Sequence, residues 1–128
     1  MIEQNVTYTG KDSLVLGDGV QTDSVVPTAA TAYKRGDLLV IDPATNTATH
    51  SVDGTDWHVV CLEDVTTAQA DAAISAKFEI PVYTQGELNV LEVTLNGVKL
   101  NEGQQKAARG RANTATSIEL RMPFGKGV

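Results

Sequence analysis

The residues best suited to chemistry are a histidine, a thiol and a carboxylate in one short segment. His58, Cys61 and Glu63 belong to the run WHVVCLEDV, and these residue types can bind a metal ion or assist a nucleophile. The run, however, has the apolar composition of a β-strand, on which positions three apart point to opposite faces. His58 and Cys61 therefore cannot converge on one ion, and we expect a packed cysteine and a hydrogen-bonded histidine.

Two other motifs have simpler structural explanations. Asp53 and Asp56 lack the alternating acids and the terminal glutamate of a calcium loop, so they indicate a turn. Arg35-Gly36-Asp37 spells the tripeptide that cell-adhesion receptors bind, but three residues recur easily by chance, and here they lead directly into an apolar strand. We therefore expect Gly36 to make a corner and Asp37 to open the strand.

The remaining polar candidates are isolated. His50 stands alone in a polar turn and is expected to be exposed. Arg109 and Arg111 lie near a predicted helix end, where they meet the negative end of the helix dipole. A phosphate-binding role has little support, because no aromatic residues interleave with these charges. No Ser-His-Asp or paired-carboxylate arrangement can be defined, so we expect no enzyme, no cofactor and no metal.

The segment from Asp37 to Val65 predicts the centre of the fold. DLLVID and WHVVCLEDV have strand composition, and a turn-rich connection, PATNTATHSVDGTD, separates them. In Asp37–Asp42 neighbouring positions are all apolar, with Leu38 on one face and Leu39 on the other. Both faces must be covered, which is typical of a central strand.

The second half of the chain adds strands and a helix. Phe78, Ile80 and Val82 alternate with polar residues and predict an inward strand face, which Pro81 places towards a sheet edge. Thr84-Gln85-Gly86 and Asn96-Gly97 both suggest hairpin turns. The other expected elements are a short helix or loop at TTAQADAAIS, a helix capped by Asn101 with Gln104 over 104–112, and a strand over 116–122. The fold class is mainly β, a compact barrel-like domain with one short helix in its C-terminal half.

Composition limits the function classes. The chain has 128 residues, 41% of them hydrophobic, and a formal net charge of −6, which disfavours nucleic acid or an anionic membrane as the main partner. Residues 1–98 carry −10 and residues 99–128 carry +4, so unlike surfaces of two subunits could meet, although a solvated surface with internal ion pairs explains the same pattern. The chain has one cysteine and no secretory signal or apolar run of membrane length, which predicts a protein of the cytosol.

Residues 1–31 differ from the rest of the chain. They are rich in Thr, Val, Asp and Gly, with weak periodicity. This composition predicts an extended N-terminal arm over 1–31, followed by a β-rich domain over 32–128. An arm of this kind can add a strand to the sheet edge of another protein. Val6 and Tyr8, or Leu14 and Leu16, are spaced to point the same way, and Val25 belongs to a second apolar patch.

With these segments identified, the chain resembles bacteriophage head decoration proteins of the phage lambda D type. The resemblance covers about Ala32 to Met122. It rests on the order of several segments: AYKRGDLLVID, a Thr-rich excursion, WHVVCLEDV, FEIPVYTQGELN, a helix ending in AARGRAN, and TSIELRM.

The resemblance implies a β-tulip fold and homotrimers on the outer surface of the phage head, assembled in the host cytoplasm. It implies binding to the major capsid (coat) protein at the three-fold and quasi-three-fold sites of the expanded head. In that family the N-terminal arm adds a strand to the coat protein and stabilises the shell. By position in the chain alone, the arm contacts would fall on Val6, Tyr8, Leu14, Leu16 and Val25.

Two functions of other classes remain open. A β-barrel module that binds sugars or peptides would need an aromatic groove, and the chain has one Trp, three Tyr and two Phe with which to line it. A small hydrolase would need a site built from His58 and nearby acids, and replacing His58 with alanine would then abolish activity.

Overall fold

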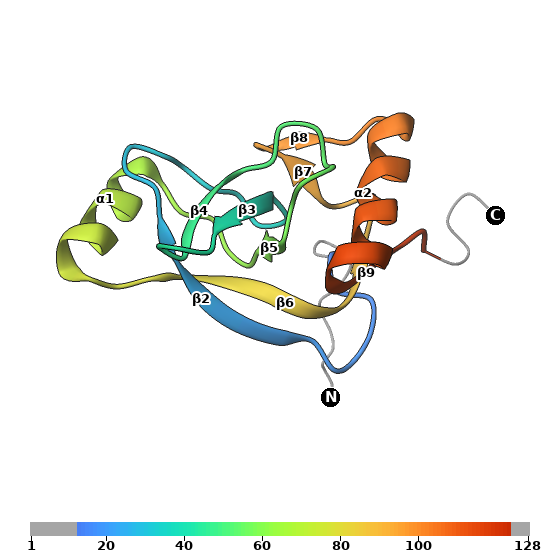
Figure 1. Ribbon diagram of the computed structural model, residues 1–128, viewed down its shortest axis with the longest axis horizontal. Coiled ribbons are helices and arrows are strands. Elements are labelled where there is room, and N and C mark those ends of the chain that lie inside the picture. The colour runs from blue at the N-terminus through green and yellow to red at the C-terminus, as the bar shows by residue number, and fades with distance from the viewer. Residues whose placement is uncertain (1–12, 124–128) are drawn as a thin grey trace.

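The computed structural model describes residues 13–123, which form a compact, mainly β structure (Figure 1). The strands in this range are β2 (Gln21–Pro27), β3 (Leu38–Asp42), β4 (Thr47–His50), β5 (Val59–Cys61), β6 (Ile80–Asn89), β7 (Thr94–Leu95), β8 (Val98–Lys99) and β9 (Ser117–Arg121). The helices are α1 (Thr67–Ala76) and α2 (Glu102–Ala115). The mainly β, barrel-like fold class is confirmed, with two helices in place of the single helix expected. Neither helix is long and apolar enough to cross a membrane.

The main sheet is a partly closed barrel. Its strand order is β2-β4-β3-β5-β6-β9, and β2 pairs with β6 as well as with β4, so five of the strands form a ring of pairings. β2 runs antiparallel to the first half of β6, from Val25 opposite Ile80 to Gln21 opposite Gln85. β9 extends the sheet by running parallel to the second half of β6.

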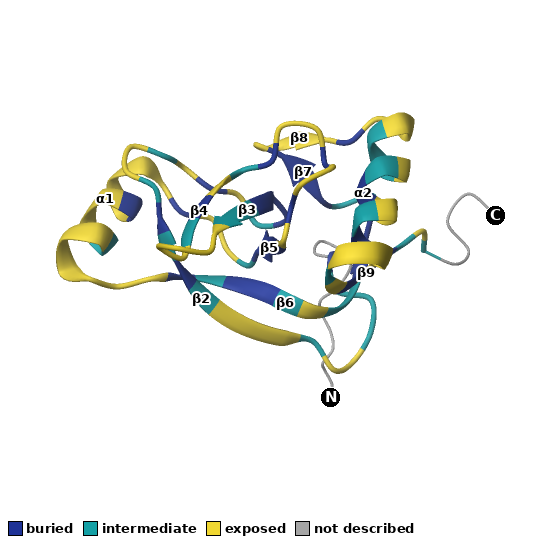
Figure 2. Cartoon of the chain, viewed as in Figure 1, coloured by how far each residue is buried: buried dark blue, intermediate teal, exposed yellow. Residues whose placement is uncertain are grey.

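The central strands contribute to two apolar clusters, because successive side chains point to opposite faces. Every strand of the ring contributes to the barrel cluster: Val25, Leu39, Ala48, Val59, Cys61, Ile80 and Val82, joined by Tyr33, Val65 and Ala70. The intervening residues Leu38, Val60 and Tyr83 face a second cluster that includes Trp57 and the alanines of α2. Leu38 and Leu39 are both fully buried, whereas Val40 and Ile41 are partly exposed, so the strand is covered on both faces, as predicted, at its start and only partly beyond it (Figure 2).

β6 differs from its prediction in two places. It is a central strand, paired with β2, β5 and β9, although Pro81 suggested an edge. Pro81 has no N–H to donate to Leu62 O across the pair, and that carbonyl accepts from Nη1 of Arg35 instead. The other bond of the pair is kept, because Leu62 N donates to Pro81 O. Gly86 does not make a hairpin turn either; with φ +128, it lets Val20 come within 2.6 Å of where a Cβ would lie, and β6 continues through it.

The segment after β6 follows its local signals. Asn96 and Gly97 both have positive φ and join β7 to β8, as the favoured hairpin turn requires. Asn101 then caps α2: its Oδ1 accepts from Gln104 N at 2.8 Å, and Gln104 Oε1 accepts from Asn101 N at 3.0 Å. The predicted capping box is confirmed. The buried face of α2 consists of Ala108 and Ala112.

Phe78 does not belong to the buried face predicted for it. α1 ends at Lys77, which adopts the left-handed conformation with φ 62, and β6 begins only at Ile80. The inward alternation therefore starts at Ile80 and Val82, which are buried, while Phe78 is 70% exposed.

Candidate functional site

His58 and Cys61 are engaged separately, as predicted. Cys61 is fully buried in the barrel cluster and its thiol donates to Glu63 O at 3.1 Å. Burial raises the pKa of this thiol to about 12, so a reactive thiolate is disfavoured near neutral pH. His58 Nδ1 accepts from Ile41 N–H at 2.9 Å, and desolvation, followed by the charge of Arg111, lowers the pKa of the ring.

The acidic turn at Asp53 binds its own backbone. Its Oδ1 accepts from the backbone N–H and the hydroxyl of Thr55, at 3.0 and 2.7 Å, and these bonds lower the pKa of the exposed carboxyl. Over residues 13–123, no group of three or more His, Cys, Asp or Glu side chains is placed to hold a metal ion. The prediction of a turn is confirmed.

Asp37 is a buried structural carboxylate. Its Oδ1 accepts from Thr94 Oγ1 and from Gly97 N, and its Oδ2 accepts from Lys34 N. It therefore joins the start of β3 to the β7–β8 hairpin. Gly36 makes the corner, with φ +99 and a Cβ position only 2.7 Å from Glu92 O. The Arg-Gly-Asp tripeptide is thus a folding element, because its carboxylate is inaccessible to a receptor.

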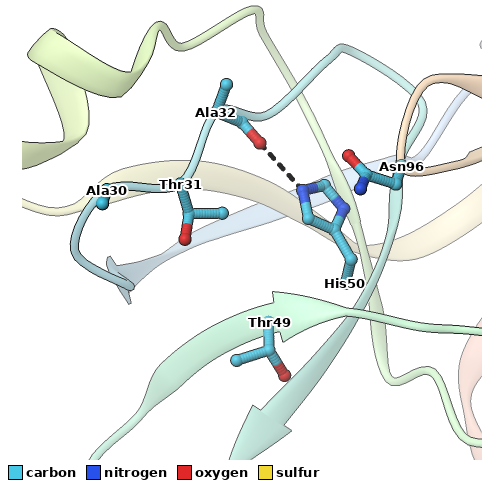
Figure 3. A pocket seen from close by; sticks show the side chains of 6 residues that line it. All are labelled: Ala30, Thr31, Ala32, Thr49, His50 and Asn96. Atoms are coloured by element: carbon cyan, nitrogen blue, oxygen red, sulfur yellow. Dashed lines mark hydrogen bonds between the residues drawn. The ribbon is translucent and has the colours of Figure 1, made fainter.

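His50 is not an exposed turn residue as expected. It ends β4, stacks on Tyr33 with ring centroids 5.1 Å apart, and leaves 13% of its side chain exposed. Its Nε2 lies 2.8 Å from Ala32 O (Figure 3); a carbonyl only accepts, so Nε2 carries the proton. Nδ1 then faces Asp37 Oδ2 at 3.6 Å. The stacking on Tyr33 and the contact with Ala32 O hold the ring against the barrel cluster.

The ring of His50 borders an open hollow of about 390 Å³ (Figure 3). The other lining residues are Ala30, Thr31, Ala32, Thr49 and Asn96. The hydroxyl of Thr31 donates to Ala29 O at 3.1 Å, away from the imidazole. The lining offers no activated nucleophile and no aromatic platform, so it supports neither hydrolysis nor sugar stacking.

The predicted partner contacts at Leu14 and Val25 are instead internal, whereas Leu16 is bonded within the chain through its backbone and keeps a partly exposed side chain. Leu14 and Val25 are 3% and 4% exposed, one in each apolar cluster. Leu16 N donates to Glu87 O at 2.9 Å, and Asn89 N donates to Leu14 O at 2.7 Å. The expected arm is therefore bridged to β6 at Val15 and enters the sheet as β2, because β6 offers it backbone partners and the clusters offer it apolar ones. Val6 and Tyr8 lie outside the described residues.

Both ends of the described chain meet at the same end of β6. Asn89 Nδ2 donates to Ser13 O at 3.2 Å, and Val90 N donates to Arg121 O at 3.0 Å. The described chain thus begins and ends at the α2 end of the barrel, the end opposite α1 (Figure 1).

The arginines of α2 are structural. Arg109 Nε donates to Leu120 O at 3.2 Å, and Arg111 Nε donates to Trp57 O at 2.7 Å. The first bond also occupies a carbonyl of β9, which pairs on one edge only among the described strands, and so helps to block that edge against foreign strands.

An exposed apolar surface at the α1 end was missed by the sequence pattern. We define the α1 patch as Val26, Ile74, Lys77, Phe78 and Glu79, which line a hollow of about 220 Å³. The alternating pattern predicts that Phe78 is buried with Ile80 and Val82. A prediction that α1 continues to Ala76 with Lys77 as its cap would have shown that Phe78 lies outside the strand.

No protein-family model matches this sequence, and a search of curated proteins finds no match to it.

Proposed function

We propose that this protein is a structural virion protein, a trimeric decoration or cement protein. It binds the coat protein at the three-fold and quasi-three-fold sites of the expanded phage head and stabilises the capsid. The observation that carries the proposal is the arrangement of the segments on which the resemblance rests. They supply β3, β5, β6, α2 and β9 in chain order, and β6 pairs with both β5 and β9. The similar segments thus belong to one folding unit.

The N-terminal residues are the part of the chain that supports a capsid contact. Ser13 is fixed beside Asn89, so the chain that precedes it joins the barrel at a defined point. Val6 and Tyr8 lie within them, spaced to point the same way on a strand. A strand added to a coat-protein sheet gains affinity from main-chain bonds. Linked arms on one trimer would multiply the effect of each weak contact.

The test is removal of residues 1–12. We expect the truncated protein to keep its fold and size, because Leu14 and β2 remain, and to lose co-sedimentation with expanded heads that lack decoration protein. A matched control replaces residues 1–12 with a Gly-Ser segment of equal length and should also fail to bind. Deletion through Val26 would be less informative, because it removes Leu14 and Val25 from the clusters and should unfold the domain.

Two outcomes would contradict different parts of the proposal. If the protein lacking residues 1–12 binds heads as well as the whole chain does, the arm is not the contact. If the whole chain binds no expanded head, the decoration function itself is wrong, and titration against glycans and host-surface peptides would then test the alternative binding module. Sizing of the free and bound protein tests the trimer.

A further inference from the structure

α1 is poorly packed for a helix of its length. Of its residues Thr67–Ala76, only Ala70 is buried, and the helix stands at one end of the molecule with most of its surface exposed (Figure 2). Isolated helices shorter than about 12–15 residues are marginal in water, and most helical stability in proteins comes from tertiary packing. The exposed side of α1 is therefore suited to packing against a further chain segment.

The α1 patch has the shape and composition of a docking site. Its hollow lies beside the end of α1 and is lined by Val26, Ile74 and the ring of Phe78. Phe78 is 70% exposed and Ile74 37%. An exposed aromatic ring beside an exposed aliphatic side chain can anchor a partner, because aromatic residues, Phe among them, are enriched at the cores of interfaces. The other large exposed apolar residues of the described chain, Val52, Val98 and Met122, come from separate segments.

The surroundings of the α1 patch are acidic. Glu79 lines its hollow and also a neighbouring hollow, which is bordered by Glu63 and Asp64. Lys77 is the one cation in the lining of these two hollows. Glu79 accepts from the hydroxyl of Ser24 at 2.7 Å, a neutral donor that leaves its charge in place. The patch therefore suits a segment that carries an apolar ring next to a positive charge.

Residues 124–128 have this chemistry. The segment is Phe-Gly-Lys-Gly-Val, so Phe124 and Val128 flank Lys126, the one charged side chain in it. The two glycines allow the backbone to approach a surface closely. We propose that the α1 patch binds this segment of a second copy of the chain, with Phe124 against Phe78 and Ile74, and Lys126 beside Glu79.

The contact must form between copies, because a chain cannot reach its own patch. Ile80 begins β6 beside the patch, and Asn89, at its other end, lies level with Arg121. Nine strand steps of about 3.3 Å separate these ends by about 30 Å. Phe124 is only three residues beyond Arg121, and three extended residues span about 10 Å. The contact is also head to tail, joining unlike surfaces of two copies.

The contact can be tested on the free, full-length protein. A nitroxide label is placed on unlabelled copies through Val128→Cys; the native Cys61 is fully buried and should stay unmodified. These copies are mixed with ¹⁵N-labelled protein. We expect distance-dependent broadening of the amide signals of Ile74, Lys77 and Phe78, which decreases at high salt, and no broadening at Val52. Broadening confined to another face, or none at all, would overturn the proposal.

Matched variants give the affinity. A fluorescent peptide of residues 120–128 is titrated into the full-length Phe124→Ala protein, whose own segment competes less. Adding Phe78→Ser should raise the dissociation constant of the peptide by about tenfold or more, the effect of removing a central aromatic anchor. Val52→Ser, at a residue that is 85% exposed, should leave it unchanged. Equal effects of the two changes would contradict the proposal. Because neither experiment uses heads, failure here is distinguishable from failure of capsid binding.

Discussion

The two helices begin in the same way and are used differently. α1 and α2 each start with a complete capping box, built from Thr66 with Gln69 and from Asn101 with Gln104. α2 then buries Ala108 and Ala112 in the cluster that contains Trp57. α1 buries Ala70 alone. Local sequence is therefore sufficient to start both helices, whereas packing decides which of them supports the fold.

Small residues explain how α2 approaches the barrel. Gly54 has φ +82, and a Cβ there would lie 3.5 Å from the Cβ of Ala108, so the loop before β5 passes close to the helix. The indole of Trp57 is fully buried and donates to Ala108 O at 3.3 Å. At the other end, Phe78 follows the C-cap of α1 and its side chain is 70% exposed. One end of the molecule is thus core, and the other is available surface.

Removing one aromatic side chain at each end tests this contrast, and it should give the largest difference in the free energy of unfolding. Trp57→Ala should lower the free energy of unfolding by about 3–5 kcal/mol, because it leaves a cavity and an unmade hydrogen bond. Phe78→Ala should change it by less than about 0.5 kcal/mol, as is usual for exposed positions. Urea denaturation of both variants at low protein concentration measures the difference. Comparable costs would mean that the α1 end is also part of the core.

A second test concerns the barrel cluster, which holds both Cys61 and the single buried residue of α1, Ala70. Burial raises the pKa of the Cys61 thiol from its ordinary value of 9.0 to about 12. Between these pH values the unfolded chain releases a proton that the folded protein keeps. The free energy of unfolding should therefore be unaffected by this group below pH 9 and fall above it, by about 1.4 kcal/mol per pH unit.

The measurement is urea denaturation at pH 8, 9 and 10, with Cys61→Ala as the control. The variant has lower stability overall, but the part of the pH dependence due to the thiol should disappear. Burial also raises the pKa of Tyr33, whose ordinary value is 10.0, so the range from pH 9 to 10 isolates the thiol best. Identical slopes in both proteins would show that water reaches the barrel cluster, and that α1 does not seal it.

The contrast also explains what the sequence could and could not predict. The continuous apolar run of β3, the Asn96-Gly97 turn and the Asn101 cap depend on neighbouring residues, and the sequence predicts all three. Pro81, Gly86 and His50 were misjudged because distant parts of the chain decide their environments. Arg35 compensates for the proline, Val20 approaches the glycine, and Tyr33 stacks on the histidine.

The N-terminal segment and the α1 patch show the same limit. Residues 13–27 lack clear periodicity, yet long-range pairing with β6 and β4 places them in the sheet. Phe78 continues the alternation of Ile80 and Val82 in sequence, but its N–H donates to Ala73 O at 2.8 Å, so it belongs to the capped end of α1 and β6 begins only at Ile80. A pattern of apolar residues predicts that a side chain needs covering; it does not say whether the cover comes from the same chain.

The smallest and most specific effect comes from removing the two caps. In α1 Thr66 Oγ1 accepts from Gln69 N at 3.1 Å, and in α2 Asn101 Oδ1 accepts from Gln104 N at 2.8 Å. Losing such a bond costs a helix about 1 kcal/mol.

Asn101→Ala should lower the global free energy of unfolding by about that amount, since α2 unfolds with the core. Thr66→Ala should leave the global value nearly unchanged and instead accelerate hydrogen exchange of the α1 amides, because a helix with one buried residue can open locally. Equal losses of global stability would mean that α1 unfolds only with the whole domain, so that its exposed face would not be a separately adjustable surface.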